Sequence, residues 1–460
     1  MRKPAIAALF LAILTAALTG TAACSPAADP ADPAGAGASG DAGRRATAAD
    51  IEKALQTETT LTFWSWVPDI DKTVALFERK YPKVKINLVN AGQSAAHYTK
   101  LQSVVKAGSG APDVAQLEYF ALPQFALSKA VVDLNRYGAA ETKDAFTPSA
   151  WEQVTVNGGV YGVPQDTGPM VMFYRTDVFD RLKLDPPKTW EEFRTVAEKI
   201  KADDPDAFVT SVDPSDAGGV DSLIWQAGGR PFAIQDATTV RVNLRDEGTG
   251  RWAALWGDLA KRKLVDPAVG WNDAWWRDMA SGKYAVWIAG AWAPGAIAST
   301  IPQSTGKWRA APMPQWDPAA PAAAENGGSA VSVLTQSRNP LAAVGFARWL
   351  NSDPEAVRSL NTASGLFPAT RELLGSAEFT EAEIPVLGGQ KANKVFAEAS
   401  ARVAPGWQYL PFQVYANSVM KDTLGRAVAA GTDLGAGLTA WQEQITAYAR
   451  QQGFTLASGS

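Results

Sequence analysis

The order of strand-like and helix-like segments after residue 60 constrains the fold of this chain more than any other feature. Apolar runs, alternation and helical spacing of apolar residues predict five consecutive elements. These are a strand over Leu61–Trp64, a helix over Ile70–Lys80 with Asp69 as its cap, a strand over Val84–Leu88, a helix over about Tyr98–Ala107 and a strand over Asp113–Leu117. Strands alternating with helices predict an α/β domain with a largely parallel sheet.

The same pattern indicates where a ligand would bind. In open α/β sheets, ligands occupy the crevice beyond the carboxyl ends of the strands. The loops that begin at Ser65, Asn90 and Glu118 follow the three predicted strands. We therefore expect functional side chains in these loops.

The first 24 residues have the pattern of a secretory signal peptide. Arg2 and Lys3 precede a short apolar run and a small-residue region that ends at Cys24. Ala22-Ala23-Cys24-Ser25 resembles a bacterial lipobox, so residues 1–23 are expected to be removed and Cys24 to carry a lipid anchor. Residues 24–50 would then form a flexible linker that holds the folded body at the outer face of the bacterial cytoplasmic membrane. Thr21 stands where a lipobox usually has Leu, which leaves soluble secretion as the alternative.

Composition excludes several classes of function. The chain has one Cys and one His, too few for zinc fingers, disulfide frameworks or His-based metal cages. Lys and Arg number 43 against 47 Asp and Glu, and this net charge of −4 argues against nucleic-acid binding. We expect no metal and no cofactor. Catalysis would have to use carboxylates, Lys, Tyr or His97.

Tryptophan is the outlying residue type. Eight of the 17 lie between Trp252 and Trp308. Trp252 and Trp256 have helical spacing and are expected to pack in a core. Trp292 is bounded by Gly290 and Pro294 just after a predicted strand over Ala285–Ile288, which places its indole on a turn. A flat ring there could stack on a sugar or a cationic head group, or it could simply pack.

Carboxylates complete the candidate chemistry. Asp69, Glu118 and Asp166 are expected near the crevice, where each could accept hydrogen bonds from ligand hydroxyls or remain a solvated loop residue. Two carboxylates could alternatively run glycoside hydrolysis, which depends on their separation.

A set of motifs resembles the extracellular solute-binding proteins of ABC importers, in the sugar-binding group. The similarity extends from about Leu61 to Phe454. In family order, the motifs are Gly162–Asp166 with Phe173–Arg175, Pro187–Phe193, Ser281–Trp287 with Gly290–Trp292, Gly328-Ser329, Pro340–Ala343 with Phe346–Leu350, and Gly365–Arg371.

This resemblance implies an α/β, two-lobed periplasmic-binding-protein fold of the class II type, with the ligand in the inter-lobe cleft. By analogy, lobe 1 takes residues 59–167 plus 327–375, and lobe 2 takes 168–326 plus 376–455. Trp292 corresponds to the stacking Trp, Glu118 and Asp166 to hydroxyl acceptors, and Arg371 to a donor. Further expected ligand-binding residues are Trp66, Trp225, Trp271, Gly290 and Gly328.

The resemblance also implies a function without catalysis: a lipid-anchored monomer that binds a sugar or oligosaccharide by hinge closure and delivers it to the membrane permease. Two alternatives stay open. One is a secreted glycoside hydrolase that uses Glu118 and Asp166. The other is a binding protein for a quaternary amine or a polyamine, for which the Arg371 donor would be dispensable.

Overall fold

The computed structural model describes residues 45–460 of the chain. The expected signal peptide (1–23), Cys24 and most of the expected linker lie outside these residues. Among residues 45–460, no helix combines the length and the apolar character that crossing a membrane requires.

One seven-stranded sheet organises the described chain. Its order is β11-β6-β13-β3-β1-β2, with β12 also paired to β6. These strands are β1 (Thr59–Trp64), β2 (Val84–Val89), β3 (Val114–Glu118), β6 (Val163–Arg175), β11 (Val286–Gly290), β12 (Trp308–Ala311) and β13 (Glu325–Val333). The β1–β2 and β1–β3 pairs are parallel, whereas β13 and β6 pair antiparallel with all their neighbours. The expectation of a largely parallel sheet is therefore correct only for the first three strands.

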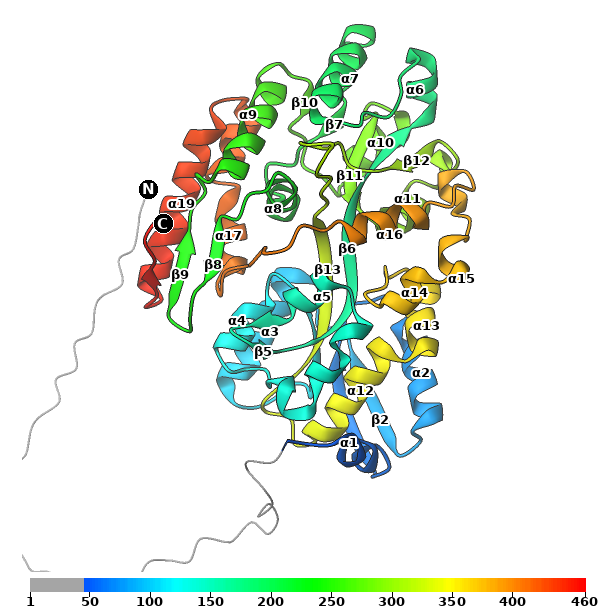
Figure 1. Cartoon of the computed structure of the whole chain (residues 1–460), viewed down its shortest axis with the longest axis vertical. Coiled ribbons are helices and arrows are strands. Elements are labelled where there is room, and N and C mark those ends of the chain that lie inside the picture. Colours follow the sequence, from blue (N-terminus) through cyan, green and yellow to red (C-terminus); the bar gives the residue numbers. More distant parts are fainter. Residues whose placement is uncertain (1–44) are drawn as a thin grey trace, which may run out of the picture. The chain divides into compact units, whose positions relative to one another are not determined.

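Buried side chains separate into cores that define two lobes. One core contains residues of β1, β3 and the final part of β13, and we call the elements packed around it lobe 1. Two further cores contain residues of the second half of β6, β11 and the helices around them, which we call lobe 2. Strand β6 contributes buried residues to both lobes, whereas Ala324, just before β13, joins a core of lobe 2 and the end of β13 joins that of lobe 1. Figure 1 shows the two strands running between the two sets of elements.

The elements of lobe 1 other than its sheet strands are α1 (Ala48–Leu55), α2 (Ile70–Lys80), α3 (Ser94–Ala107), α4 (Leu122–Leu127), η1 (Leu134–Tyr137), η2 (Ala139–Ala145), α5 (Pro148–Gln153), β4 (Thr155–Val156), β5 (Gly159–Val160), α12 (Pro340–Ser352) and α13 (Pro354–Ser364).

The corresponding elements of lobe 2 are α6 (Thr176–Leu182), α7 (Trp190–Asp203), β7 (Thr210–Ser211), α8 (Ala217–Gln226), β8 (Phe232–Ile234), β9 (Thr239–Val242), α9 (Glu247–Lys261), β10 (Val265–Asp266), α10 (Asp273–Ser281), α11 (Ala293–Thr300), η3 (Pro302–Ser304), α14 (Arg371–Gly375), α15 (Ala377–Thr380), η4 (Pro385–Leu387), α16 (Asn393–Ala401), α17 (Gln413–Met420), α18 (Leu424–Ala430), α19 (Leu434–Gln451) and β14 (Thr455–Leu456).

The structure revises the expected boundaries at two places. Helix α1 begins at Ala48, inside the expected linker, and buries Ile51 and Leu55 against lobe 1. Gly345 of α12 permits this close approach, because a Cβ there would lie 2.9 Å from both side chains. Near the other boundary, Leu373 and Leu374 were expected in lobe 1, but they join a core of lobe 2.

The N-termini of α7 and α2 differ in how far they follow the capping signals of the sequence. Thr189 caps α7 by accepting a hydrogen bond from the Glu192 N–H, and the Glu192 side chain accepts one from the Thr189 N–H. This is the capping box that the sequence predicts. Helix α2 has the predicted bounds, and Asp69 occupies its N-cap position as predicted, but the Asp69 side chain does not cap the helix. Asp69 has a left-handed backbone (φ 57°), makes no capping hydrogen bond, and instead forms an ion pair with Lys72 at 3.2 Å.

Candidate functional site

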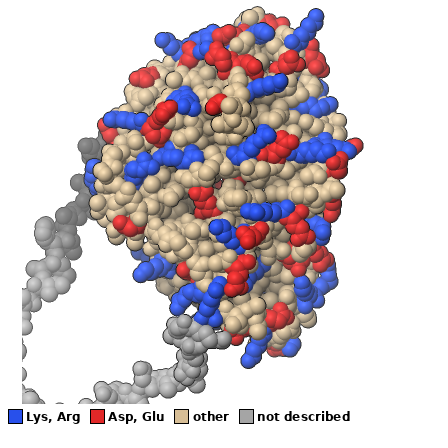
Figure 2. Space-filling view, in the orientation of Figure 1, with Lys and Arg blue, Asp and Glu red and all other residues tan. Residues whose placement is uncertain are grey.

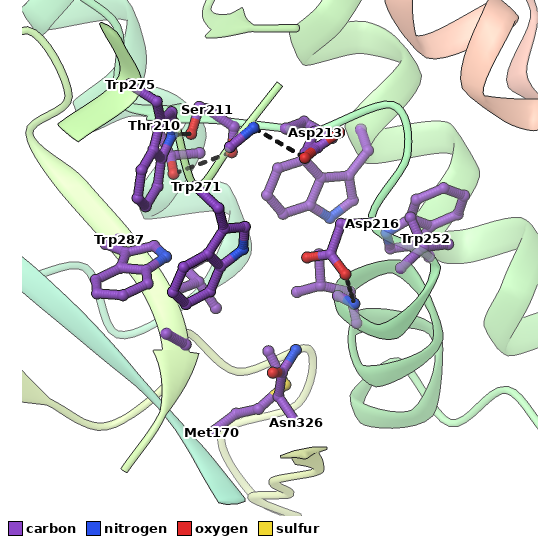
Figure 3. A pocket seen from close by; sticks show the side chains of 18 of the residues that line it. Met170, Thr210, Ser211, Asp213, Asp216, Trp252, Trp271, Trp275, Trp287 and Asn326 are labelled. Carbon is purple, nitrogen blue, oxygen red and sulfur yellow. Dashed lines mark hydrogen bonds between the residues drawn. The ribbon is translucent and has the colours of Figure 1, made fainter. Parts of the chain in front are cut away.

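A pocket in lobe 2 reaches the crossing strands (Figure 3). It has a cavity volume of about 150 Å³ and is lined by Met170, Thr210, Ser211, Val212, Asp213, Asp216, Gly219, Val220, Leu223, Trp252, Trp256, Gly270, Trp271, Trp275, Trp287, Ile288, Ala289, Trp292 and Asn326. Met170 belongs to β6 and Asn326 to β13, so the pocket borders both crossing strands. Its lining contains two carboxylates and several indoles but neither Lys nor Arg.

Five indoles form a contiguous cluster at this pocket. Their ring centroids lie 4.6–6.1 Å apart, in tilted or edge-to-face arrangements. The members are Trp271, Trp275, Trp276, Trp287 and Trp292. Aromatic pairs prefer such offset geometries, because the positive ring edge meets the negative face. The cluster is therefore a stable apolar wall, part of which is open to solvent.

Trp292 joins this wall to a crossing strand. It is half-buried, and its indole Nε1 donates to the Asn326 carbonyl oxygen at 2.8 Å. Gly290 makes room for the ring, because a Cβ at Gly290 would lie 2.4 Å from that nitrogen. The turn predicted from the flanking Gly and Pro is present, as Trp292 sits between β11 and α11. Gly290 thus shapes the site by having no side chain.

Trp271 is the exposed member of the cluster. Its side chain is 57% exposed, and its ring is inclined by 35° to that of Trp292, with centroids 5.7 Å apart. Its backbone has a φ of 64°, a conformation that bulky residues seldom adopt. The protein therefore holds a large apolar ring toward solvent at the mouth of the pocket.

Three carboxyls lie where the crossing strands meet lobe 1. Glu118 accepts a hydrogen bond from the Tyr98 hydroxyl at 2.9 Å, and Asp166 accepts one from Ser329. Glu325 is only 2% exposed; its carboxylate accepts from the Ser149 hydroxyl at 2.9 Å and the Gly168 N–H at 2.7 Å. Burial raises the pKa of Glu118 and of Glu325 to about 7, and that of Asp166 to about 6.

Hydrogen bonds connect the loop after β1 with strands β3, β13 and β6 in this region. The Ser65 hydroxyl donates to the Gln116 side-chain oxygen at 2.8 Å, and the Gln116 amide donates to the Ser329 hydroxyl at 3.0 Å. Ser329 in turn donates to Asp166. Asp166 is therefore part of a hydrogen-bond network with Ser329, Gln116 and Ser65, and is not a solvated loop residue.

Glu325 should make folding stability depend on pH. Its folded-state pKa of about 7, against an ordinary value of 4.5, means that folding favours the protonated form. The resulting stabilisation is complete below pH 4.5 and is lost as pH rises through about 7. At about 1.4 kcal/mol per pKa unit, Glu325 alone contributes roughly 3 kcal/mol of this dependence. Glu118 and Asp166 act in the same direction.

The measurement is the free energy of unfolding between pH 4.5 and 8. Glu325→Gln imitates the protonated carboxyl, since its amide can donate to Ser149 while its oxygen accepts from Gly168. This variant should lose much of the decline in stability that the wild type shows with rising pH. Glu247→Gln, at an exposed ion pair, is the control and should follow the wild type. An unchanged slope in Glu325→Gln would contradict this interpretation.

Two further expected residues border the carboxyl region. Trp66 is half-buried, with its ring centroid 5.0 Å from that of His97, and its backbone N–H approaches the Gln116 side chain at 3.4 Å. Gly328 has a φ of 96°, and a Cβ there would lie 2.6 Å from the Tyr119 ring. Neither residue lines the tryptophan pocket, so both remain candidates on the lobe 1 side.

Trp225 is a core residue, contrary to the prediction that it forms part of the ligand wall. Its side chain is 1% exposed and stacks on Trp407 with centroids 5.3 Å apart and planes within 7°. Its indole nitrogen donates to the Ala404 carbonyl oxygen at 2.6 Å. The stacked ring face and the polar atom of Trp225 are therefore both engaged within the protein, and the buried side chain cannot contact a ligand.

Arg371 lies outside the tryptophan pocket. It begins α14, and its Nε donates to the Phe146 carbonyl oxygen at 2.8 Å. The side chain lines a different pocket, together with Asp144 and Glu372. The motif match gave the position of Arg371 in the chain but not the direction of its side chain.

Several polar lining residues were missed. Ser211 is the last residue of the two-residue strand β7, and Asp213 follows that strand. Asp216 caps α8, and Asn326 is the second residue of the crossing strand β13. A strand of two residues leaves no alternation to detect. The Asp-Pro-Ser-Asp string at 213–216 is a turn signal, which could have marked this loop but not its position beside the tryptophans.

Comparison with known proteins identifies the family. Residues 56–357 match the model of the bacterial extracellular solute-binding protein family, and the chain belongs to that family. An arabinooligosaccharide-binding protein of Bacillus subtilis (strain 168) is 25% identical over 337 residues, which are 70% of this chain and 76% of the relative.

Two solved structures match over most of the described residues. The ABC transporter associated binding protein of B. animalis subsp. lactis Bl-04, in complex with β-1,6-galactobiose, is 37% identical with a TM-score of 0.76. The match covers 87% of this chain and 100% of the other. The galacto-N-biose-/lacto-N-biose I-binding protein of Bifidobacterium longum, in complex with lacto-N-biose, is 25% identical with a TM-score of 0.75, covering 86% and 98%. The two-lobed α/β fold predicted from the sequence motifs is confirmed.

Proposed function

We propose that this protein is the sugar-binding component of an ABC importer, and that it binds a sugar or oligosaccharide between its lobes and delivers it to the permease. The arrangement of Trp271 and Trp292 carries the proposal: two inclined indoles, one of them 57% exposed, border a pocket that reaches both crossing strands. An exposed indole offers an apolar face to a sugar ring. The saccharides named in the related complexes support this ligand class.

The mechanism follows from the position of the pocket. Lobe 2 supplies the indoles, whereas Glu118 ends strand β3 of lobe 1, and Asp166 of β6 pairs with the same β13 residue, Ser329, as Glu118 does. A ligand that stacks on lobe 2 and donates hydroxyls to these carboxyls would stabilise the closed arrangement of the lobes. Ligand-dependent closure predicts a smaller radius of gyration in X-ray scattering when saccharide is added.

Hydrolysis is the competing function for Glu118 and Asp166. The family consists of solute-binding proteins, and the pocket lining offers indole faces and carboxylates that can bind a ligand without reacting with it. Incubation with 4-nitrophenyl galactosides and glucosides should release no 4-nitrophenol above a blank. Turnover that Glu118→Gln abolishes would favour the hydrolase.

A cationic ligand remains a second candidate, since the pocket combines indoles with Asp213 and Asp216 and has no Lys or Arg in its lining. Arg371 no longer separates the two ligand classes, because it lies in another pocket. Direct titration does: choline and putrescine should produce no saturable change in tryptophan fluorescence, whereas a matching disaccharide should.

Anchoring of the mature protein is proposed at Cys24. Cys24→Ala should move the protein from the membrane fraction into the medium or periplasm, since Cys24 is the chain's single cysteine and ends a signal-peptide pattern. The measurement is fractionation followed by mass spectrometry of the mature N-terminus. Wild-type protein with an unmodified N-terminus and no membrane association would contradict the anchor. We propose that the protein acts as a monomer.

A further inference from the structure

Trp271 has an unusual backbone for its residue type. Its φ of 64° lies in the left-handed region, where the Cβ of a bulky residue crowds its own backbone. The ring is nevertheless 57% exposed, so burial of the side chain does not account for this conformation. Strained residues persist where the surrounding structure holds them in place, and they concentrate at functional sites.

Asp213 makes the bond that holds the residue before Trp271. Its Oδ2 accepts a hydrogen bond from the Gly270 N–H at 2.8 Å, one of the bonds drawn in Figure 3. Its Oδ1 accepts from the Ser215 N–H at 2.7 Å and from the Ser215 hydroxyl at 2.6 Å. Asp213 therefore ties the loop after β7 to the loop that carries Trp271.

Asn272 secures the other side of Trp271. Its side-chain amide donates to the Val269 carbonyl oxygen at 2.7 Å, and its side-chain oxygen accepts from the Trp275 N–H at 3.0 Å as the cap of α10. Asn272 therefore fixes the start of α10 after Trp271, and Asp213 fixes the backbone at Gly270, just before Trp271. Of the two, Asp213 also lines the pocket.

The indoles of Trp271 and Trp292 cannot enclose a sugar ring between them. Their centroids are 5.7 Å apart, whereas a ring between two faces needs roughly 7 Å, about two van der Waals contacts. A ligand can therefore contact Trp271 and Trp292 only from outside the pair, whose planes are inclined by 35°. Two neighbouring, inclined indoles suit consecutive rings of a saccharide chain better than a single ring.

We propose that Asp213 is a positioning residue, which holds Trp271 beside Trp292 as the second stacking surface for a saccharide of at least two residues. This inference rests on the proposed function. Asp213 acts through the Gly270 backbone, so its carboxylate need not contact the ligand. Removing the Asp213 carboxylate should therefore weaken disaccharide affinity when Trp271 is present and have no further effect when Trp271 has been removed.

The matched control is Asp236, which forms the same type of turn elsewhere in lobe 2. Its Oδ1 accepts from the Thr238 N–H at 2.8 Å and from the Thr238 hydroxyl at 3.1 Å, in an exposed loop between β8 and β9. Asp236 has the Asp-x-Thr turn but no bond to a tryptophan-bearing loop. Asp213→Ala and Asp236→Ala therefore remove similar local turns with different expected consequences.

The experiment compares calorimetric affinities for β-1,6-galactobiose, lacto-N-biose and galactose. Asp213→Ala should weaken disaccharide binding about fivefold or more, whereas Asp236→Ala should leave it unchanged. The double variant Asp213→Ala/Trp271→Ala should bind no more weakly than Trp271→Ala alone, because both changes remove the same surface. Additive losses, or an Asp213→Ala affinity within twofold of the wild type, would overturn the proposal.

A readout without ligand separates this proposal from the proposed function. In protein labelled with 5-fluorotryptophan, Trp271→Phe identifies the ¹⁹F signal of residue 271. Asp213→Ala should shift and narrow that signal as the ring loses its fixed position, and Asp236→Ala should not. If no saccharide binds the wild type, the proposed function fails, and an unchanged ¹⁹F signal in Asp213→Ala refutes the positioning role by itself.

Discussion

Trp292→Ala should lower saccharide affinity at least thirtyfold, or about 2 kcal/mol, the typical cost of removing a central aromatic contact. The loss combines the stacking face with the anchor to the crossing strand, since Nε1 bonds the Asn326 carbonyl oxygen at 2.8 Å. Isothermal calorimetry on the folded variant measures it. The free energy of unfolding should fall by a smaller amount, because the ring is only half-buried.

Trp292→Phe is the matched control for this prediction. It keeps an aromatic face but removes the indole N–H, so its affinity should lie between those of the wild type and Trp292→Ala. An Ala variant whose affinity stays within twofold of the wild type would show that Trp292 packs and does not stack on ligand.

Trp225→Ala should behave in the opposite way and cost about 3–5 kcal/mol of unfolding free energy, as expected for a fully buried Trp. The change removes the stack on Trp407 and leaves the Ala404 carbonyl oxygen without its donor. Urea denaturation measures the loss, and ligand affinity below the transition should stay near that of the wild type. A stable variant with weakened binding would restore the ligand-wall role that the sequence suggests.

The different environments of Trp292 and Trp225 illustrate which features of the site can be predicted from sequence. Gly290 and Pro294 mark a turn around Trp292, and a turn after a strand is a local property that residue types determine. Trp225 lies in helix α8. The helical spacing of apolar residues is the same whether a Trp packs in the core or lines a ligand pocket, so it does not separate the two roles. Its partner Trp407 is 182 positions away, and no local pattern reports such a contact.

Long-range placement also explains the other differences. The orientation of Arg371 depends on its bond to the Phe146 carbonyl, and Glu325 matters because Ser149 and Gly168 converge on it. Asp213 reaches Gly270 across two loops. The early strands and the Thr189 capping box could be predicted because their signals span only a few residues. The mixed direction of the sheet arises from crossing strands whose pairing joins distant segments.

On the described face in Figure 2, Lys and Arg are interspersed with Asp and Glu, and no continuous basic area is visible. This distribution agrees with the argument from net charge against nucleic-acid binding on that face. The pocket differs from this surface, because its lining contains Asp213 and Asp216 but neither Lys nor Arg.

The most direct test of saccharide binding is a calorimetric titration of the wild-type protein with β-1,6-galactobiose, lacto-N-biose and a set of arabino- and glucooligosaccharides. We expect saturable binding of at least one saccharide at one site per chain, and no binding of choline or putrescine. Saturable binding of a cation, with no heat from any saccharide, would contradict this expectation.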